Sequence, residues 1–139
     1  MAGKRQAIID ASAIVAVLSE KDQWHKLATP LFVNLKRPFF TCESAISETC
    51  FLVGAKHKKS VISLLKDGVI EIGFSLSDEI DNIARLMTKY DSVPMSFADS
   101  CLVRMSEILD APIFTFDADF RIYRRHGNRK IPLIGIEEV

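Results

Sequence analysis

The sequence has 139 residues, of which 48% are hydrophobic and 26% are charged, and it contains only 6 Gly and 5 Pro. These values are typical of one globular domain, here expected to span residues 1–139, and they exclude collagen-like and low-complexity chains. The 18 basic and 18 acidic residues cancel. This balance excludes nucleic-acid binding through bulk positive charge. It leaves two local alternatives, a basic patch or a metal ion bound at an acidic site.

The three cysteines are Cys42, Cys50 and Cys101. Their odd number and the lack of a C-x-x-C spacing argue against a disulfide framework and against a zinc site built from cysteines. No stretch approaches the roughly 20 apolar residues of a membrane helix, and Asp10 interrupts the apolar run near the N-terminus. We therefore expect free thiols in a cytoplasmic protein without a membrane segment.

The first part of the chain predicts two strands and two helices. Residues 6–9 (QAII) form a short apolar run that predicts a buried strand, and residues 11–18 predict the helix that follows. A second helix is expected over residues 23–35, where Pro30 must kink or split it because proline lacks the amide proton. Residues 39–41 (FFT) predict the next strand.

Glycines mark the ends of the next two helical segments. Residues 44–54 predict a helix that stops at Gly54, and residues 59–67 predict another that is closed by Gly68. A strand is expected over residues 69–72. The next helix carries Leu76, Ile80, Ile83 and Met87 at helical spacing, with Ser77 or Asp78 as its N-cap. The last expected elements are a helix over 96–109, a strand over 113–115 and an apolar piece over 131–136. This alternation predicts an α/β domain with a mostly parallel sheet and helices on both faces.

Four carboxylates stand out by their positions, and these are Asp10, Glu48, Asp99 and Asp117. Asp10 and Asp117 follow predicted strands, and ligand sites of open α/β sheets lie outside the carboxyl ends of the strands. Glu48 lies three residues after Ala45 and four before Leu52, a spacing that puts it on an apolar helix face. A carboxylate there is costly unless it is paired or bound to a metal.

Each of these carboxylates also has a structural explanation when it is taken alone. Asp10 could be the N-cap of the helix that follows it, and Asp117 could be a turn residue. Asp99 could complete a capping box with Ser96. Together, however, several carboxylates that converge in a cleft repel one another. A divalent cation is the usual compensation, and oxygen ligands suit Mg²⁺ or Mn²⁺.

The segments around these four residues resemble the motifs of the PIN-domain ribonuclease family. Residues 8–12 (IIDAS) resemble its opening strand and first acidic motif, and residues 46–48 (ISE) resemble the second. Residues 96–100 (SFADS) are similar to the third motif and residues 115–120 (TFDADF) to the fourth. The order and spacing cover nearly the whole chain and look most like the VapC-type toxins of bacterial and archaeal toxin–antitoxin pairs. Free-standing PIN proteins share the same size and layout.

The resemblance implies a PIN-like three-layer α/β/α fold with a central, mostly parallel sheet, and a Mg²⁺- or Mn²⁺-dependent endoribonuclease. It also implies RNA, a small antitoxin protein and a second copy of the chain as partners. The site residues it implies are the catalytic and metal-binding carboxylates Asp10, Glu48, Asp99 and Asp117, and the further metal ligand Asp119. It also implies two supporting hydroxyls, Ser12 to orient Asp10 and Thr115 to orient Asp117. Asp119 is alternatively a helix-start residue.

RNA that approaches an acidic pocket needs basic residues beside it. The RNA-binding residues expected after the fourth motif are Arg121, Arg124 and Arg125, with Arg129 and Lys130 following. A second basic run, residues 56–59, is interpreted as a solvated helix face. Tyr123 and Phe120 could stack on bases, although Phe120 is favoured as a core residue.

Other classes of protein explain the pattern less well. A receiver-type regulatory domain needs an adjacent acidic pair after its first strand, but Asp10 stands alone there. A haloacid-dehalogenase-like phosphatase needs a second Asp where this chain has Ser12. A non-catalytic, RNA-binding PIN domain remains an alternative, and the complete set of four carboxylates favours the catalytic one.

Overall fold

The computed structural model describes residues 5–139, so residues 1–4 of the expected domain lie outside the described part. Its centre is a five-stranded sheet in the order β3-β2-β1-β4-β7, and the described pairings are all parallel. The strands are β1 (Gln6–Ile9), β2 (Lys36–Thr41), β3 (Ile70–Ile72), β4 (Ile113–Thr115) and β7 (Leu133–Gly135). The predicted parallel α/β sheet is therefore confirmed.

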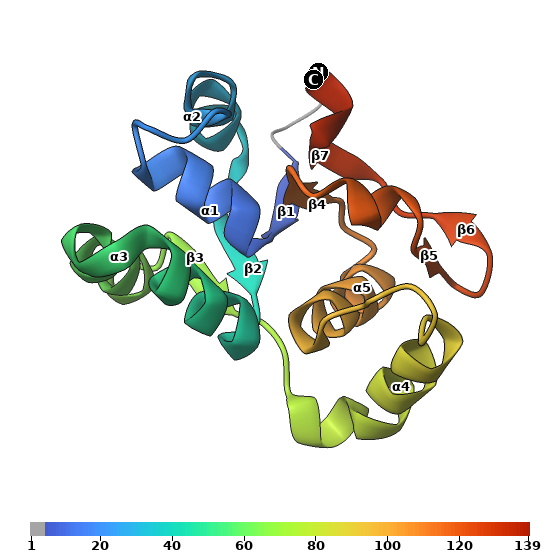
Figure 1. Cartoon of the computed structure of the whole chain (residues 1–139). Helices are drawn as coiled ribbons and strands as arrows, with labels where there is room; N and C mark the ends of the chain where they lie inside the picture. Colours follow the sequence, from blue (N-terminus) through green and yellow to red (C-terminus); the bar gives the residue numbers. More distant parts are fainter. Residues whose placement is uncertain (1–4) are drawn as a thin grey trace.

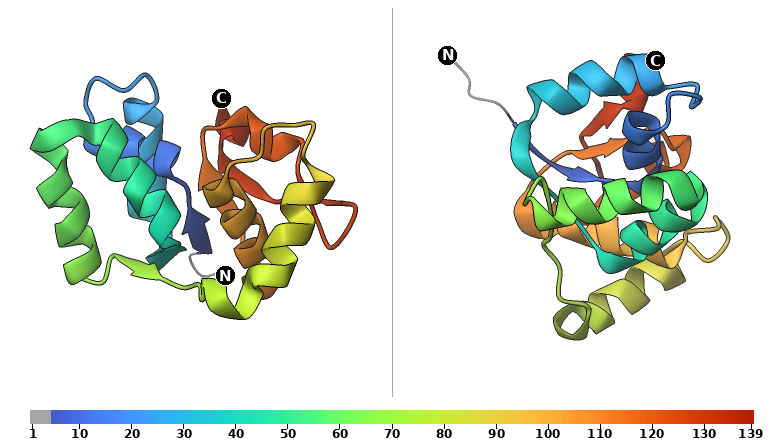
Figure 2. Two further views of the ribbon diagram at one scale, coloured as in Figure 1. Left: turned by 60° about the horizontal axis from the view of Figure 1, so that its bottom comes forward. Right: turned by 90° about the vertical axis from the view of Figure 1, so that its left-hand side faces the viewer.

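Helices cover both faces of this sheet (Figures 1 and 2). Side chains of a strand alternate between faces, so Ala7 and Ile9 of β1 join one buried cluster and Ile8 joins the other. The first cluster packs under α1 (Ala11–Leu18) and α2 (His25–Asn34). The second packs under α5 (Phe97–Leu109), and α4 (Leu76–Lys89) lies outside α5. These three layers are the predicted α/β/α arrangement.

The helix α3 (Glu43–Lys66) is bent at Gly54. Gly54 has φ 72° and ψ −178°, a region that only glycine adopts readily. The predicted stop at Gly54 is therefore confirmed as a break between two helical parts. The second part begins directly after Gly54 instead of at Lys59, so the basic run 56–59 lies within a helix.

Other boundaries differ from the prediction for local reasons. α2 is not split at Pro30 but continues through it, because a helical proline removes only one backbone donor and the other bonds of the turn remain. The N-cap of α4 is Ser75 rather than Ser77 or Asp78. The predicted basic turn contains a small antiparallel hairpin, β5 (Arg124–Arg125) and β6 (Arg129–Lys130), between the 3₁₀ helices η1 (Ala118–Arg121) and η2 (Ile136–Glu138).

The three cysteines are free, as expected. Within the described part of the chain, no helix has both the length and the apolar character needed to cross a bilayer.

The strand order places one pair of strand ends at a special position. From β1 the chain runs outward to β2 and β3, and it then returns to β4 on the other side of β1. In parallel sheets, the point where the order reverses leaves a crevice outside the carboxyl ends of the two central strands. Asp10 follows β1 and Asp117 follows β4 at this switch point.

Candidate active site

Asp10 is buried at the carboxyl end of β1, with 4% of its surface exposed. Its backbone amide donates to the carbonyl of Phe114 in β4 over 3.0 Å. In the described residues its carboxylate makes no capping bond to α1. It accepts instead from the hydroxyls of Ser12 and Thr115, each 2.8 Å from Oδ2. The carboxylate is therefore held across the β1–β4 junction, and N-capping does not account for it.

The two hydroxyls also organise the loop that carries the fourth motif. Ser12 Oγ accepts from the amide of Phe116, and Thr115 Oγ1 accepts from the amide of Asp117, both over 3.0 Å. The resemblance implied that Ser12 orients Asp10 and that Thr115 orients Asp117. In the structure both hydroxyls donate to Asp10, and Thr115 contacts Asp117 through its backbone.

Asp99 lies in the first turn of α5 and is 7% exposed. Its amide donates to Ser96 Oγ over 3.0 Å, which is one half of the proposed capping box. The second hydrogen bond of the box, from the Ser96 amide to the Asp99 carboxylate, is not found among the described residues. Asp99 Oδ2 instead accepts from the hydroxyl of Tyr123 over 2.9 Å. N-capping therefore explains the hydrogen bond of the Asp99 amide but not the position of its carboxylate.

Glu48 lies on the first part of α3 and is exposed. The prediction of an apolar helix face here is wrong, because Leu52 is 54% exposed and only Ala45 of the three is buried. Among residues 5–139 the Glu48 side chain has no hydrogen-bond partner. The charges of Asp10 and Asp117 nevertheless act on Glu48, because both contribute to the rise of its pKa.

Asp117 is half-buried and begins η1, where its Oδ1 accepts from the amide of Asp119 over 2.9 Å. This contact is the turn role considered for Asp117, and it leaves Oδ2 without a described partner among residues 5–139. Asp119 is exposed at the start of the 3₁₀ helix. Its position fits the helix-start alternative, and its part in metal binding stays a prediction.

The charges of Asp10 and Asp117 act on the other carboxylates of this set. Burial raises the pKa of Asp99 to about 7, and the charge of Asp10 is the next cause. Burial also raises the pKa of Glu48, with the charges of Asp10 and then Asp117 adding to the rise. The pKa of Asp10 is raised by burial and further by Asp117, against the hydroxyl hydrogen bonds that lower it. Because the charge of Asp117 raises the pKa of each of the other three, all four carboxylates lie within the range of direct charge interaction.

A divalent cation is the group that the family resemblance implies, and the donors fit it in chemical type. Carboxylate oxygens are ligands that Mg²⁺ and Mn²⁺ prefer, and a cation offsets the repulsion that raises these pKa values. Within the described residues, no three acidic, histidine or cysteine side chains already enclose a position for an ion. Asp10 and Asp99 are fixed by hydrogen bonds, whereas Glu48 is exposed and free to turn.

The three arginines predicted to bind RNA all make contacts within the chain. Arg121 donates to the carbonyl of Ile136, and Arg125 donates to the carbonyl of Ser106 and pairs with Asp110 at the end of α5. Arg124 donates through Nη1 to carbonyls of the preceding turn. Arg125 is thus at the opposite end of α5 from Asp99, and RNA binding by these residues stays a prediction.

Tyr123 is the residue whose role the sequence did not reveal. It was considered for base stacking, which is wrong because its side chain is fully buried, as is that of Phe120. Phe120 is a core residue as favoured, and its ring meets the Tyr123 ring edge-on. A buried tyrosine hydroxyl requires a partner, but no sequence pattern indicates that this partner is Asp99, 24 positions away.

Comparisons with known proteins agree with this geometry. The PIN domain family model matches residues 7–125. The crystal structure of VapC20 from Mycobacterium tuberculosis, described as a toxin that cleaves the sarcin–ricin loop, superposes with a TM-score of 0.73. It shares 19% sequence identity, and the match covers 82% of this chain and 92% of that one. No curated protein matches the sequence. Because the family model spans most of the chain and includes all four carboxylates, the protein belongs to the PIN domain family.

Proposed function

We propose that the protein is a Mg²⁺- or Mn²⁺-dependent endoribonuclease. One observation carries the proposal. Asp10, Glu48, Asp99 and Asp117 come from four distant segments, and the charges of Asp10 and Asp117 raise the pKa values of Glu48 and Asp99 near the switch point of the sheet. Such a cluster is unfavourable for folding by itself, and it is what cation-dependent cleavage of a phosphodiester requires.

The residues of the chain have distinct tasks in this proposal. A bound cation would lower the pKa of a coordinated water and stabilise negative charge on the phosphate. Ser12 and Thr115 hold the Asp10 carboxylate in one orientation, and Tyr123 holds that of Asp99. Hydrogen bonds to the ionised form favour it, so these donors counteract the burial of both groups. The family resemblance implies in-line attack, with a 5′-phosphate and a 3′-hydroxyl as products.

The test is cleavage of a panel of tRNA, rRNA and unstructured RNA, with Mn²⁺ and with excess EDTA. We expect cleavage with the cation only. Asp10→Asn and Asp99→Asn should each lower it by orders of magnitude while the protein stays folded by circular dichroism. Full activity of purified Asp99→Asn, or of the wild type in EDTA, contradicts the proposal.

A toxin role within a toxin–antitoxin pair is the more specific part of the proposal. It is supported by the motif layout and by the structural likeness to VapC20, which is itself described as a toxin. The partners would be RNA, a small antitoxin protein that covers the cleft and a second copy of the chain, all in the cytoplasm. A short reading frame upstream whose co-expression relieves growth arrest supports this role. Growth without arrest when the protein is expressed alone and active contradicts it.

A further inference from the structure

A basic pocket lies between α4, α5 and the β5–β6 hairpin, outside the carboxylate cluster. Its volume is about 170 Å³. The residues that line it include Arg85 and Lys89 from α4, Glu107 from α5 and Arg124 from the hairpin. Figures 1 and 2 show these three elements together at the edge of the molecule, away from α1 and α2.

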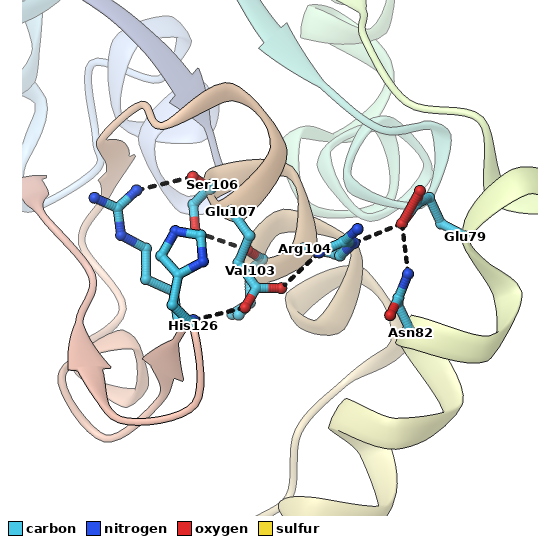
Figure 3. Close-up of polar contacts among 8 residues, drawn as sticks. Glu79, Asn82, Val103, Arg104, Ser106, Glu107 and His126 are labelled. Carbon is cyan, nitrogen blue, oxygen red and sulfur yellow. Dashed lines mark hydrogen bonds and ion pairs between the residues drawn. The ribbon is translucent and has the colours of Figure 1, made fainter.

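A polar network holds the walls of this pocket in place (Figure 3). Arg104 of α5 pairs with Glu79 of α4, and Glu79 also accepts from Asn82. Arg104 pairs with Glu107 as well, and Glu107 Oε2 accepts from the amide of His126 in the hairpin over 2.7 Å. These contacts join α4 to α5 and α5 to the hairpin.

The same network leaves an excess of positive charge in the pocket. Glu79 and Glu107 share the single positive charge of Arg104, so these three groups keep one net negative charge, against the three cations Arg85, Lys89 and Arg124 that line the pocket. Among residues 5–139 Lys89 donates to a neutral carbonyl, that of Gly127, and its ammonium group lies over the ring of Tyr90. Arg85 is exposed, and among residues 5–139 its side chain has neither an ion pair nor a hydrogen bond. The described hydrogen bonds of the Arg124 side chain use Nη1 and backbone carbonyls, which leave its charge uncompensated.

The pocket is connected to the carboxylate cluster by two adjacent residues. Tyr123 donates to Asp99, and Arg124 is the next residue along the chain. The amide of Arg124 donates to the hydroxyl of Tyr90 over 2.8 Å, and the rings of Tyr90 and Tyr123 pack edge to face. Tyr90 and Tyr123 are both buried, so these contacts fix the position of the pocket relative to Asp99. Glu107, which lines the pocket, lies eight residues after Asp99 on α5, or about 12 Å along the helix.

We propose that this pocket binds a phosphodiester group of the RNA chain away from the bond that is cleaved, with Arg85, Lys89 and Arg124 as its cationic contacts. The inference rests on the proposed nuclease function. Arginine and lysine beside a cavity of this size suit a phosphate oxygen better than a base. An anionic RNA chain that approaches an acidic site also needs positively charged residues nearby to bind it. The net charge of the whole protein is zero, so a local group of basic residues must provide this attraction.

The test uses Arg85→Gln in the full chain, because the Arg85 side chain makes no described hydrogen bond or ion pair that the fold depends on. Lys26→Gln, at an exposed position on α2, is the matched control. Binding of a fluorescent single-stranded RNA is measured by anisotropy in EDTA at several salt concentrations. The slope of log affinity against log salt becomes shallower by about 0.7 for each phosphate of a single strand that the protein no longer neutralises. We expect the full change of about 0.7 for the Arg85→Gln, Lys89→Gln double variant, a smaller change in the same direction for Arg85→Gln, and none for Lys26→Gln.

Cleavage assays separate this inference from the function on which it rests. With Mn²⁺ present, Arg85→Gln should raise KM and leave kcat near the wild-type value. If the wild type cleaves RNA and Arg85→Gln equals Lys26→Gln in affinity and salt slope, the pocket assignment is wrong and the nuclease stands. If the wild type cleaves no RNA but binds it through Arg85, the nuclease fails and the pocket stands. Loss of poly-glutamate binding with unchanged RNA binding would assign the pocket to an acidic protein segment and overturn the proposal.

Discussion

The hydroxyl of Tyr123 donates a 2.9 Å hydrogen bond to Oδ2 of Asp99, and both side chains are buried. This bond lowers the pKa of Asp99 and so opposes the effects of burial and of Asp10. Tyr123 is therefore expected to position Asp99 and to keep it ionised, although it touches no reacting atom in the proposed mechanism.

We predict that Tyr123→Phe shifts the pH–activity profile to higher pH and weakens Mn²⁺ binding, because the Asp99 carboxyl then holds its proton more tightly. The loss of one hydrogen bond should also cost about 1 kcal/mol of unfolding free energy. Tyr90→Phe is the control, because the Tyr90 ring packs against Tyr123 but its hydroxyl accepts from the amide of Arg124 and does not contact Asp99. An equal shift of the pH profile in both variants would show that the effect is merely structural.

Thr115→Val is predicted to lower kcat/KM by about 10- to 100-fold, the range found when groups that orient metal ligands are removed. Valine keeps the shape of threonine but cannot donate to Asp10 or accept from the amide of Asp117. The control is Thr49→Val, a buried threonine whose hydroxyl bonds only to the carbonyl of Ala45 within α3. Steady-state cleavage of one RNA substrate measures both, and comparable reductions would contradict a specific role for Thr115.

The stability of the metal-free protein is predicted to rise as the pH falls from about 8 to about 5. Asp99 has a pKa of about 7 in the folded chain against an ordinary value of 3.8. The folded state therefore binds more protons than the unfolded state between these two values, and the free energy of unfolding decreases as pH increases through them. Urea unfolding in EDTA at several pH values measures this slope. Asp99→Asn should flatten it, and an unchanged slope in that variant would assign it to other groups.

Glu48→Gln is predicted to leave the metal-free protein as stable as the wild type or slightly more stable, because Asp10 and Asp117 repel the Glu48 charge. The stabilisation by a given Mn²⁺ concentration should be smaller, because the loss of a ligand raises Kd. A ligand at 100 times its Kd adds about 2.7 kcal/mol, and this value falls as Kd rises. Thermal melts with and without Mn²⁺ measure both effects. Glu43→Gln, at an exposed carboxylate in the first turn of the same helix, should match the wild type in its stabilisation by Mn²⁺.

Local patterns in the sequence predicted the elements because the relevant forces are local. The apolar run before Asp10 and the glycine at position 54 determine a strand and a break without help from distant residues. Helix starts were less certain, since Ser75 and Ser77 are chemically equivalent caps and packing decides between them. The motifs also indicated four carboxylates as the candidate site, and their role stays a prediction.

The contacts that hold these carboxylates could not be predicted in the same way. The bond from Tyr123 to Asp99 and the shared donation of Ser12 and Thr115 to one oxygen of Asp10 depend on tertiary packing. For Glu48 the local pattern was misleading. Helical periodicity predicted an apolar helix face around it, but α3 exposes part of that face to solvent.

The junction of β1 and β4 has a consequence for biosynthesis. Asp10 is made early, but its hydroxyl partner Thr115 and the donor to Asp99, Tyr123, belong to the last part of the chain. A nascent polypeptide that is still being elongated on the ribosome therefore carries the acidic groups without the donors that orient them. The hydrogen bonds that orient Asp10 and Asp99 are therefore completed only when translation is nearly finished.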